Sequence, residues 1–376
     1  MIAGAANDNA VKTAFVIAVT VLNWPLFGFS PVILANIAAL CFILPFVILA
    51  GPAAFWAQSI PPRQWLTRLK LAEVGLAVLA IGALVTQSGG LLLVAVAGFG
   101  VQSALIGPLK YALIPRLTTP ETLLNANAWM ESGTFIAILI GTLYGADWIV
   151  DAPIALTALI LALSILGLVA LYWIPELSAN AEPVQYRLSE LVHRQRRDPT
   201  SMSAIWCISG FWGLGSVWLT HLPILATDIW QVADTSVATL LGQFVVGIAS
   251  GALLGVVLKR LPRTQRVLAG AIMLLAGTAL TQPLEYELGQ IGLFITAMGG
   301  GFLALPLYTL LQDDVVHVAE RVAVNNVANA LMIVAAAGAS ILVLGLLQLP
   351  LVQWLLLLAF GQFFLCLYHR HNLRLR

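Results

Sequence analysis

Long apolar runs dominate this chain, and they restrict its fold more than any other feature. Twelve such runs follow one another, separated by short stretches rich in proline, glycine or charge. A helix needs about 20 apolar residues to cross about 30 Å of hydrocarbon. We therefore predict an all-α membrane protein of about 12 transmembrane helices, centred near Ile17, Leu44, Leu79, Gly98, Ile138, Ile165, Leu214, Val246, Leu275, Ala297, Ala337 and Leu358.

The composition excludes several other classes of protein. Hydrophobic residues make up 60% of the 376 residues and charged residues 9%, whereas an average soluble domain is about 25% charged. The net charge is +1, and no basic patch is interleaved with aromatic residues, so we expect no nucleic-acid partner. Cys41, Cys207 and Cys366 lie far apart in apolar runs without a CxxC pair. We expect them to be inert small hydrophobes, and we expect neither a metal nor a cofactor.

One long polar and basic connector, from Pro175 to about Ser203, separates the sixth and seventh predicted helices. All other connections are short. The chain is therefore predicted to form an N-terminal six-helix bundle over residues 1–176, a cytoplasmic linker over 177–203 and a C-terminal six-helix bundle over 204–376.

Lysine and arginine alternate between the predicted loops in a way that tests the helix count. The even-to-odd loops and the C-terminus hold Arg63, Arg68, Lys70, Arg116, Arg187, Arg194, Arg196, Arg197, Lys259, Arg260, Arg263, Arg266, Arg321, Arg370, Arg374 and Arg376. The opposite loops hold only Asp147, Asp151, Asp228, Asp234, Glu285 and Glu287, or no charge at all. Cytoplasmic loops are enriched in basic residues, so both termini are predicted to be cytoplasmic.

Four ionisable residues fall inside predicted spans: Asp8, Lys12, Lys110 and Glu131. Each costs at least about 2.5 to 3.5 kcal/mol on insertion scales, which makes a function the default hypothesis. Asp8 and Lys12 are spaced i and i+4, so they share a helix face and can partly neutralise each other. The alternative is a buried charge network that only holds the helices together.

As a binding site, these residues would form a polar cavity in an apolar bundle. Lys110 offers a cation to a phosphate, while Asp8 or Glu131 could hold an ammonium group or a coupling cation. Gly107 and Pro108 directly precede Lys110, which predicts a locally opened helix. The asparagines Asn7, Asn9, Asn125 and Asn127 add uncharged hydrogen-bonding groups. Mixed donors and acceptors suit a lipid head group better than a bare ion.

Aromatic residues are more frequent at the corresponding places of the second half. They are Trp206, Phe211, Trp212, Trp218 and Tyr308, with Asn325, Asn326 and Asn329 in the eleventh predicted span. A cavity that is polar on one side and apolar on the other suits a single-tailed amphiphile. The alternative is an interfacial belt or simple packing, which we favour for Trp206 and weigh equally for Trp212 and Trp218.

His193 and Asp198 match the HxxxxD spacing of glycerolipid acyltransferases, in which the aspartate orients a histidine base. Here both residues lie on the basic connector. Fewer than about 30 residues cannot form a domain that binds an acyl donor and an acceptor. We therefore interpret the match as a coincidence.

Four segments resemble the major facilitator superfamily, and within it the lysophospholipid transporter group. They are ANDNAVKTA, GPLKYALIPRLTTPETLLNANAWMESGTFIAILIGTLYG, SGFWGLGSVWLTHLP, and GGGFLALPLYTLLQ with Arg321 and Asn325 to Asn329. That group includes the membrane portion of fused acyl-acyl-carrier-protein synthetase/acylglycerophosphoethanolamine acyltransferases. The resemblance implies a two-bundle transporter that flips lysophosphatidylethanolamine and lysophosphatidylglycerol to the inner leaflet. It also implies that Asp8 and Lys110 face the substrate cavity and that Glu131 matches the family's glutamate of the fifth span.

We thus predict a non-enzymatic secondary transporter of the bacterial inner membrane, with a separate cytoplasmic acyltransferase or acyl-ACP synthetase as partner. The predicted substrate-binding residues are Asp8, Asn9, Lys12, Lys110, Tyr111, Asn127, Glu131, Trp212, Tyr308, Asn325 and Asn329. Two alternatives remain: a facilitator for another small amphiphile, drug or metabolite, and a non-transporting lipid-binding partner of an acyltransferase.

Overall fold

The structure is a computed structural model that describes every residue except 25, 27, 30, 180–186, 233–234, 283–284 and 375–376. Asp234, Arg376 and the middle of the predicted linker therefore lie outside the described residues. Within the described part the chain is all-α, with no strand. The predicted fold class is confirmed at this level.

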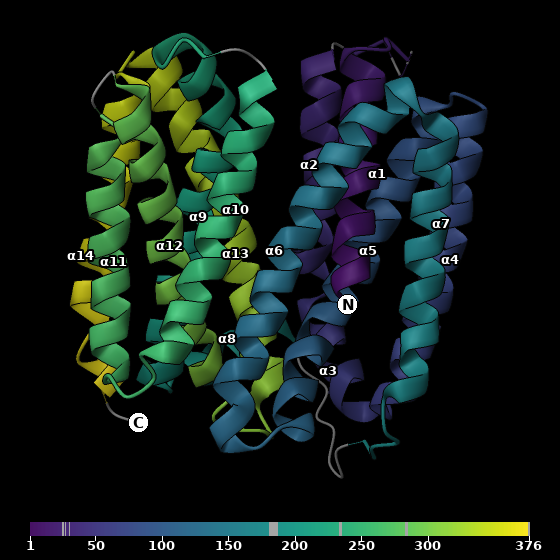
Figure 1. Ribbon diagram of the computed structural model, residues 1–376. Helices are drawn as coiled ribbons and strands as arrows, with labels where there is room; N and C mark the ends of the chain where they lie inside the picture. Colours follow the sequence, from purple (N-terminus) through teal and green to yellow (C-terminus); the bar gives the residue numbers. More distant parts are fainter. Residues whose placement is uncertain are drawn as a thin grey trace. The chain divides into compact units, whose positions relative to one another are not determined.

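Seven helices precede the connector (Figure 1). Their bounds are α1 Ile2–Thr20, α2 Pro31–Ile48, α3 Ala50–Ser59, α4 Pro62–Val85, α5 Gly89–Leu117, α6 Pro120–Asp151 and α7 Pro153–Val169. Seven more follow within the described residues. They are α8 Leu188–Arg196, α9 Pro199–Ile224, α10 Thr235–Val257, α11 Arg263–Leu280, α12 Tyr286–Leu311, α13 Val318–Ser340 and α14 Leu351–His369.

Each of the twelve predicted span centres lies inside a different helix, and only α3 and α8 contain none. Eight helices of the described chain are long and apolar enough to cross a membrane, or nine if α2 and α3, which meet at 56°, form one bent span. The charge-bearing helices α1, α4 and α11 are not among the eight. The protein is a multi-pass membrane protein, and the count of twelve stays a prediction.

Local sequence explains several helix starts. Proline occupies the first position of α4, α7 and α9. A backbone N–H at this position would have no partner within the helix, so proline loses no hydrogen bond there. Asp198 caps α9, because its carboxylate accepts the Ser201 N–H at 3.2 Å and the Ser201 hydroxyl at 2.8 Å. His193 lies on the separate helix α8. The HxxxxD spacing thus spans a helix end, and Asp198 has a capping role.

The described residues divide into two compact units. Unit 1 comprises Met1–Leu113, Ala137–Leu191 and Val316–Asn326, and unit 2 comprises Ile114–Ile136, Val192–Val315 and Val327–Arg376. Helix α6 changes unit at residues 136/137 and α13 at 326/327. The bundle boundaries at residues 176 and 204 stay a prediction.

Small residues bring the helices of each unit into close contact. In unit 1, a Cβ atom on Gly141 or Gly145 of α6 would collide with the backbone of α1 at Ala6 or Ala10. In unit 2, a Cβ atom on Gly251 of α10 would collide with the Met298 carbonyl of α12. Without a hydrophobic driving force between helices in lipid, such close backbone packing stabilises their association.

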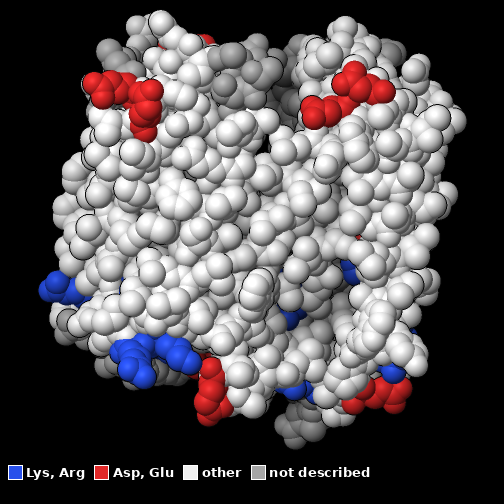
Figure 2. All heavy atoms as spheres, viewed as in Figure 1, with Lys and Arg blue, Asp and Glu red and all other residues white. Residues whose placement is uncertain are grey.

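The ends of the helices differ in charge, as the loop pattern predicts. Taken one unit at a time, the face shown in Figure 2 has acidic residues near one end of the helices, and lysine and arginine together with some acids toward the other. Ion pairs near the helix ends include Arg63 with Glu176 at 3.2 Å in unit 1 and Arg263 with Asp313 at 3.0 Å in unit 2. The predicted cytoplasmic placement of the termini stays a prediction.

Three basic residues that were assigned to loops are buried inside helices. They are Lys70 of α4, Arg266 of α11 and Arg321 of α13. The reason is geometric, since α4 begins at Pro62, α11 at Arg263 and α13 at Val318, so the predicted loops already form helical turns. Their side chains belong to the interior of the units.

Candidate functional site

Asp8 and Lys12 of α1 have separate partners. The Ser103 hydroxyl of α5 donates a hydrogen bond to Asp8 Oδ2, while Asp8 Oδ1 is buried without a partner. Lys12 Nζ donates to Asn9 Oδ1 at 2.9 Å and lies 5.2 Å from the centre of the Phe42 ring. Asp8 and Lys12 therefore bind different partners, but each charge acts on the other, as the i, i+4 spacing predicts.

A buried ion pair on α4 escaped the sequence analysis. Lys70 Nζ lies 2.5 Å from Glu73 Oε2, with the two side chains 1% and 0% exposed. Gln102 Nε2 of α5 donates to the same carboxylate oxygen at 2.8 Å. The spacing i, i+3 could have indicated this pair, because such residues share a helix face.

Lys110 and Tyr111 lie two helical turns beyond Ser103 on α5. The Lys110 ammonium is 4.6 Å from the centre of the Tyr111 ring. The predicted opening of the helix is wrong, since α5 continues as a helix through Gly107 and Pro108. Gly107 instead allows Asn326 of α13 to approach, because a Cβ atom there would lie 2.8 Å from Asn326 Nδ2. Asn325 is fully buried beside it, and neither side-chain amide atom has a hydrogen-bond partner.

In unit 2, one face of α6 carries Asn127, Glu131 and Phe135 at four-residue spacing. Asn127 Nδ2 donates to Gln312 Oε1, which follows α12, at 2.5 Å. The Phe135 ring stacks on Trp212 of α9 with a centroid distance of 5.6 Å. Glu131 is buried on this face between the two contacts.

Trp212 connects this face to α12. Its indole N–H donates to the Tyr308 hydroxyl at 2.7 Å. Tyr308 and Gln312 are four residues apart, so the Asn127 and Trp212 contacts fall on neighbouring turns. We call Asn127, Glu131, Phe135, Trp212, Tyr308 and Gln312 the polar–aromatic ladder. Close to it, the Ser209 hydroxyl donates to Asn329 Oδ1 at 2.9 Å.

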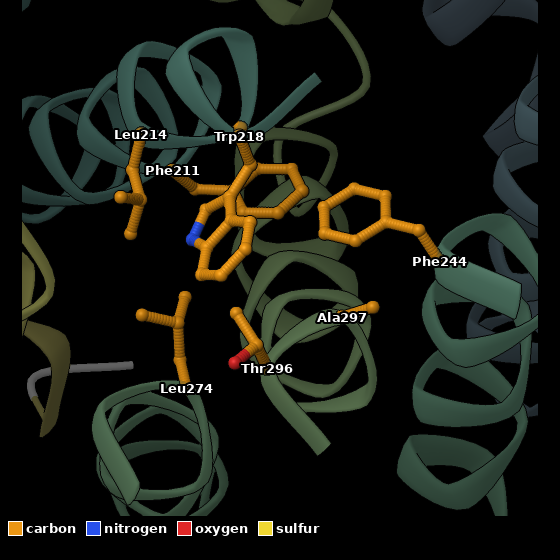
Figure 3. Close-up of a pocket in the computed structure, with 8 residues that line it drawn as sticks. Phe211, Leu214, Trp218, Phe244, Leu274, Thr296 and Ala297 are labelled. Atoms are coloured by element: carbon orange, nitrogen blue, oxygen red, sulfur yellow. The ribbon is translucent and has the colours of Figure 1, made fainter. Parts of the chain in front are cut away.

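An apolar pocket lies between α9, α10, α11 and α12 (Figure 3). It has room for about one water-sized sphere, ≈ 10 Å³. The Trp218 ring faces Phe244 with a centroid distance of 6.4 Å, and Thr296 and Leu274 lie on the opposite wall. This favours packing for Trp218. Trp206 is 43% exposed, as expected for an interfacial belt.

The predicted site residues therefore fall into two groups. Unit 1 contains Asp8, Asn9, Lys12, Lys110, Tyr111 and Asn325, and unit 2 contains Asn127, Glu131, Trp212, Tyr308 and Asn329. Sequence reasoning missed Lys70, Glu73, Gln102, Ser103 and Gln312. Cys207 and Cys366 are far apart in the sequence, but their thiols are neighbours in unit 2. Gln362 Nε2 donates to Cys207 O and Cys366 Sγ at 2.9 and 3.5 Å.

Comparison with known proteins identifies relatives of this chain. The chain is similar to the lysophospholipid transporter LplT of Yersinia enterocolitica, with 28% identity over 77% of this chain and 73% of that protein. LplT of Yersinia pestis is 30% identical over 58% of this chain and 56% of its own length, so that match spans little more than half of the relative.

Solved structures support the same fold. The crystal structure of the major facilitator superfamily transporter FucP in the outward conformation has a TM-score of 0.73 at 12% identity, and covers 98% of both chains. The sequence profile of the Major Facilitator Superfamily matches residues 8–337. The chain belongs to the major facilitator superfamily of transporters.

Proposed function

We propose that this protein is a secondary transporter that flips lysophospholipids, such as lysophosphatidylethanolamine and lysophosphatidylglycerol, across the bacterial inner membrane toward the cytoplasmic leaflet. A separate cytoplasmic acyltransferase or acyl-ACP synthetase re-acylates them there. The observation that carries the proposal is the similarity over 77% of the chain to a protein named as a lysophospholipid transporter.

The chemistry of the two units supports an amphiphilic substrate. Unit 1 places Asp8, Lys12 and Lys110 on apolar helices. In unit 2, Trp212 donates to Tyr308 and stacks on Phe135, which follows Glu131 by one turn of α6. Charged groups bind a zwitterionic or anionic head group, while aromatic surfaces accept a single acyl chain. In this proposal Lys110 binds the phosphate, and Asp8 or Glu131 binds an ammonium group where the head group has one.

The proposal includes the topology that such a transporter needs. Twelve spans form two six-helix bundles with both termini in the cytoplasm, and the bundles give access to alternate sides of the membrane. Two observations support it: the twelve span centres fall in twelve separate helices, and each unit has acidic residues near one end of its helices in Figure 2.

The test is flipping of fluorescent lysophosphatidylethanolamine in proteoliposomes, followed by dithionite quenching of the outer leaflet. We expect the wild type to flip and Lys110→Ala and Asp8→Asn to lose at least about tenfold in rate, which corresponds to about 1.4 kcal/mol. Lys259→Ala, at an exposed position after α10, is the matched control and should flip like the wild type.

Two results would contradict the proposal. Folded wild type that binds lysolipid without flipping it would favour the lipid-binding partner. Transport of hydrophilic or drug-like solutes without lysolipid flipping would favour the other-substrate facilitator.

A further inference from the structure

Arg266 of α11 is a buried base that has no acidic partner among the described residues. It is 8% exposed. In unit 1 the buried base Lys70 is neutralised by Glu73, three residues further along its helix, whereas the same position relative to Arg266 is Ala269. The charge that acts on Arg266 is the like charge of Arg263. A buried ion without a counter-charge is unfavourable, so the environment of Arg266 calls for an anion.

The guanidinium of Arg266 also has unused hydrogen-bonding capacity. Its Nη1 donates to the carbonyl of Gly255, in the last turn of α10, at 3.4 Å, and its Nε is buried without a partner. The end of α10 supplies only a partial negative charge. A guanidinium has several N–H donors in a planar fork that matches the oxygens of a phosphate group. One long hydrogen bond to a helix end satisfies little of that capacity.

The N-terminus of α11 lies beside this guanidinium. Arg266 is the fourth residue of α11, and helical side chains lean toward the N-terminus of their helix. The N-cap residue is Pro262, and no side chain caps the helix. The first N–H groups of an uncapped helix attract anions, because they have no acceptor within the helix and carry a partial positive charge. Arg266 and the start of α11 therefore present donors to the same place.

Basic residues outnumber acidic ones around this helix start. The connection from α10 and the first turn of α11 carry Lys259, Arg260, Arg263 and Arg266. At the end of α12, Asp313 pairs with Arg263 at 3.0 Å, and Asp314 is the next residue. These two acids leave an excess of positive charge. In Figure 2, basic side chains gather at the end of unit 2 where Figure 1 shows the connection between α10 and α11.

Exposed apolar side chains place this helix start at the membrane surface. Val257, at the end of α10, is 75% exposed and Leu261 is 40% exposed, and they lie on either side of Lys259 and Arg260. Helix α10 is long and apolar enough to cross a membrane. Exposed apolar side chains next to basic ones are typical of the boundary between acyl chains and head groups. The anion that can reach Arg266 from this boundary is the phosphate of a lipid.

We propose that Arg266 and the N-terminal turn of α11 form a binding site for the phosphate group of an anionic diacyl phospholipid, such as phosphatidylglycerol. The guanidinium and the free N–H groups bind the phosphate oxygens. Arg260 adds positive charge at the membrane surface, which favours an anionic head group over a zwitterionic one. This lipid is a resident of unit 2 and not a transported substrate, so the site goes beyond the proposed function.

The experiment titrates phosphatidylglycerol, and phosphatidylcholine with the same acyl chains, into the delipidated full chain and measures binding by native mass spectrometry. We expect the wild type to bind one phosphatidylglycerol at least about tenfold more tightly than phosphatidylcholine. Arg266→Gln should lower the affinity for phosphatidylglycerol at least about twentyfold, because hydrogen bonds to a charged group are lost. Arg266→Lys keeps the charge without the planar fork, so its affinity should lie between the two.

Lys259→Gln is the matched control, because Lys259 is exposed on the same connection and its replacement removes the same charge. We expect at most about a fivefold loss of affinity in this variant. Equal losses in Arg266→Gln and Lys259→Gln would indicate a diffuse basic surface and contradict the proposed site. Arg266→Gln that unfolds more easily but binds phosphatidylglycerol like the wild type would show that Arg266 only caps α10, and it would contradict the site as well.

A measurement on the wild type decides the question even if Arg266→Gln fails to fold. Phosphatidylglycerol with a photoreactive diazirine close to its glycerol should label peptides from residues 257–266, and labelling confined to other parts of the chain overturns the proposal. Displacement of the lipid by an equal concentration of inorganic phosphate overturns it too, because a free anion would then be the ligand. Lysolipid flipping does not enter these measurements, so this site and the proposed function can fail separately.

Discussion

Lys70 and Glu73 are among the most deeply buried side chains of unit 1, and each depends on the other for its charge balance. Surface pairs of the same spacing contribute little, because water solvates both partners. Here the loss of one partner leaves an ion in an apolar interior. Replacing only one member of the pair should therefore destabilise unit 1.

Glu73→Ala should destabilise the protein by about 3–5 kcal/mol, since Lys70 then stays buried without a counter-charge. The double substitution Lys70→Ala/Glu73→Ala should cost less than the sum of the two single changes. Thermal unfolding in detergent provides the measurement, and additive losses would show that the pair does not interact.

The hydrogen bond between Trp212 and Tyr308 can be removed by a single conservative substitution. Tyr308→Phe removes the acceptor of the indole N–H and keeps the ring, so we expect a loss of about 1–3 kcal/mol from the unpaired donor. Trp212→Phe removes the donor, so no buried N–H is left unpaired, and it keeps an aromatic ring against Phe135. We therefore expect a smaller loss of stability from the broken hydrogen bond in this variant. Unfolding curves measure the stability of both variants, and a Tyr308→Phe variant as stable as the wild type would mean that the hydrogen bond contributes nothing.

At the scale of helices, α12 is tightly packed on both sides. Gly251 and Gly255 of α10 and Gly270 of α11 all face it, and added Cβ atoms there would meet its backbone or side chains within 3 Å. Close contacts of this kind leave little room for sliding. The helices α10, α11 and α12 should therefore move together.

Gly251→Ala should destabilise unit 2 by about 1–3 kcal/mol, because the new methyl group collides with the Met298 carbonyl. Gly338→Ala on α13 is the matched control, since nothing lies within 4 Å of its Cβ position. That change should be neutral or stabilising by up to about 1 kcal/mol. Fluorescence-detected size exclusion after heating compares the thermal stability of the two variants. A similar loss of folded protein in both would refute the packing argument.

The sequence could predict where helices lie, because hydropathy and length determine the spans directly. It could not predict how far α4 and α11 extend, since basic residues near a helix start resemble a loop. Lys70 was misplaced for this reason, and Glu73 was overlooked with it. The Asn127–Gln312 contact joins residues 185 positions apart, and nothing in a single sequence indicates such a pair.

For the whole molecule, the two units do not follow the order of the chain. Residues 114–136 and 316–326 each group with helices of the opposite half. The predicted site residues were individually placed in helices, yet their partition between units could not be read from spacing. Only contacts decide which unit a residue joins.

The orientation in the membrane provides a prediction at this scale. In a chain without native cysteines, a cysteine at Asp151 should react with an impermeant maleimide in spheroplasts. A cysteine at Arg260 should react only after the membrane is permeabilised, because basic loops stay in the cytoplasm. Labelling of Arg260→Cys in sealed spheroplasts would reverse the proposed topology.

The neighbouring thiols of Cys207 and Cys366 have a consequence for such labelling. Both are fully buried between α9 and α14, whereas Cys41 is partly exposed. In the native chain, a small thiol reagent should modify Cys41 first and reach the other two only when α9 and α14 separate. The number of modified thiols per molecule would then record, without any added probe, how often these two helices come apart.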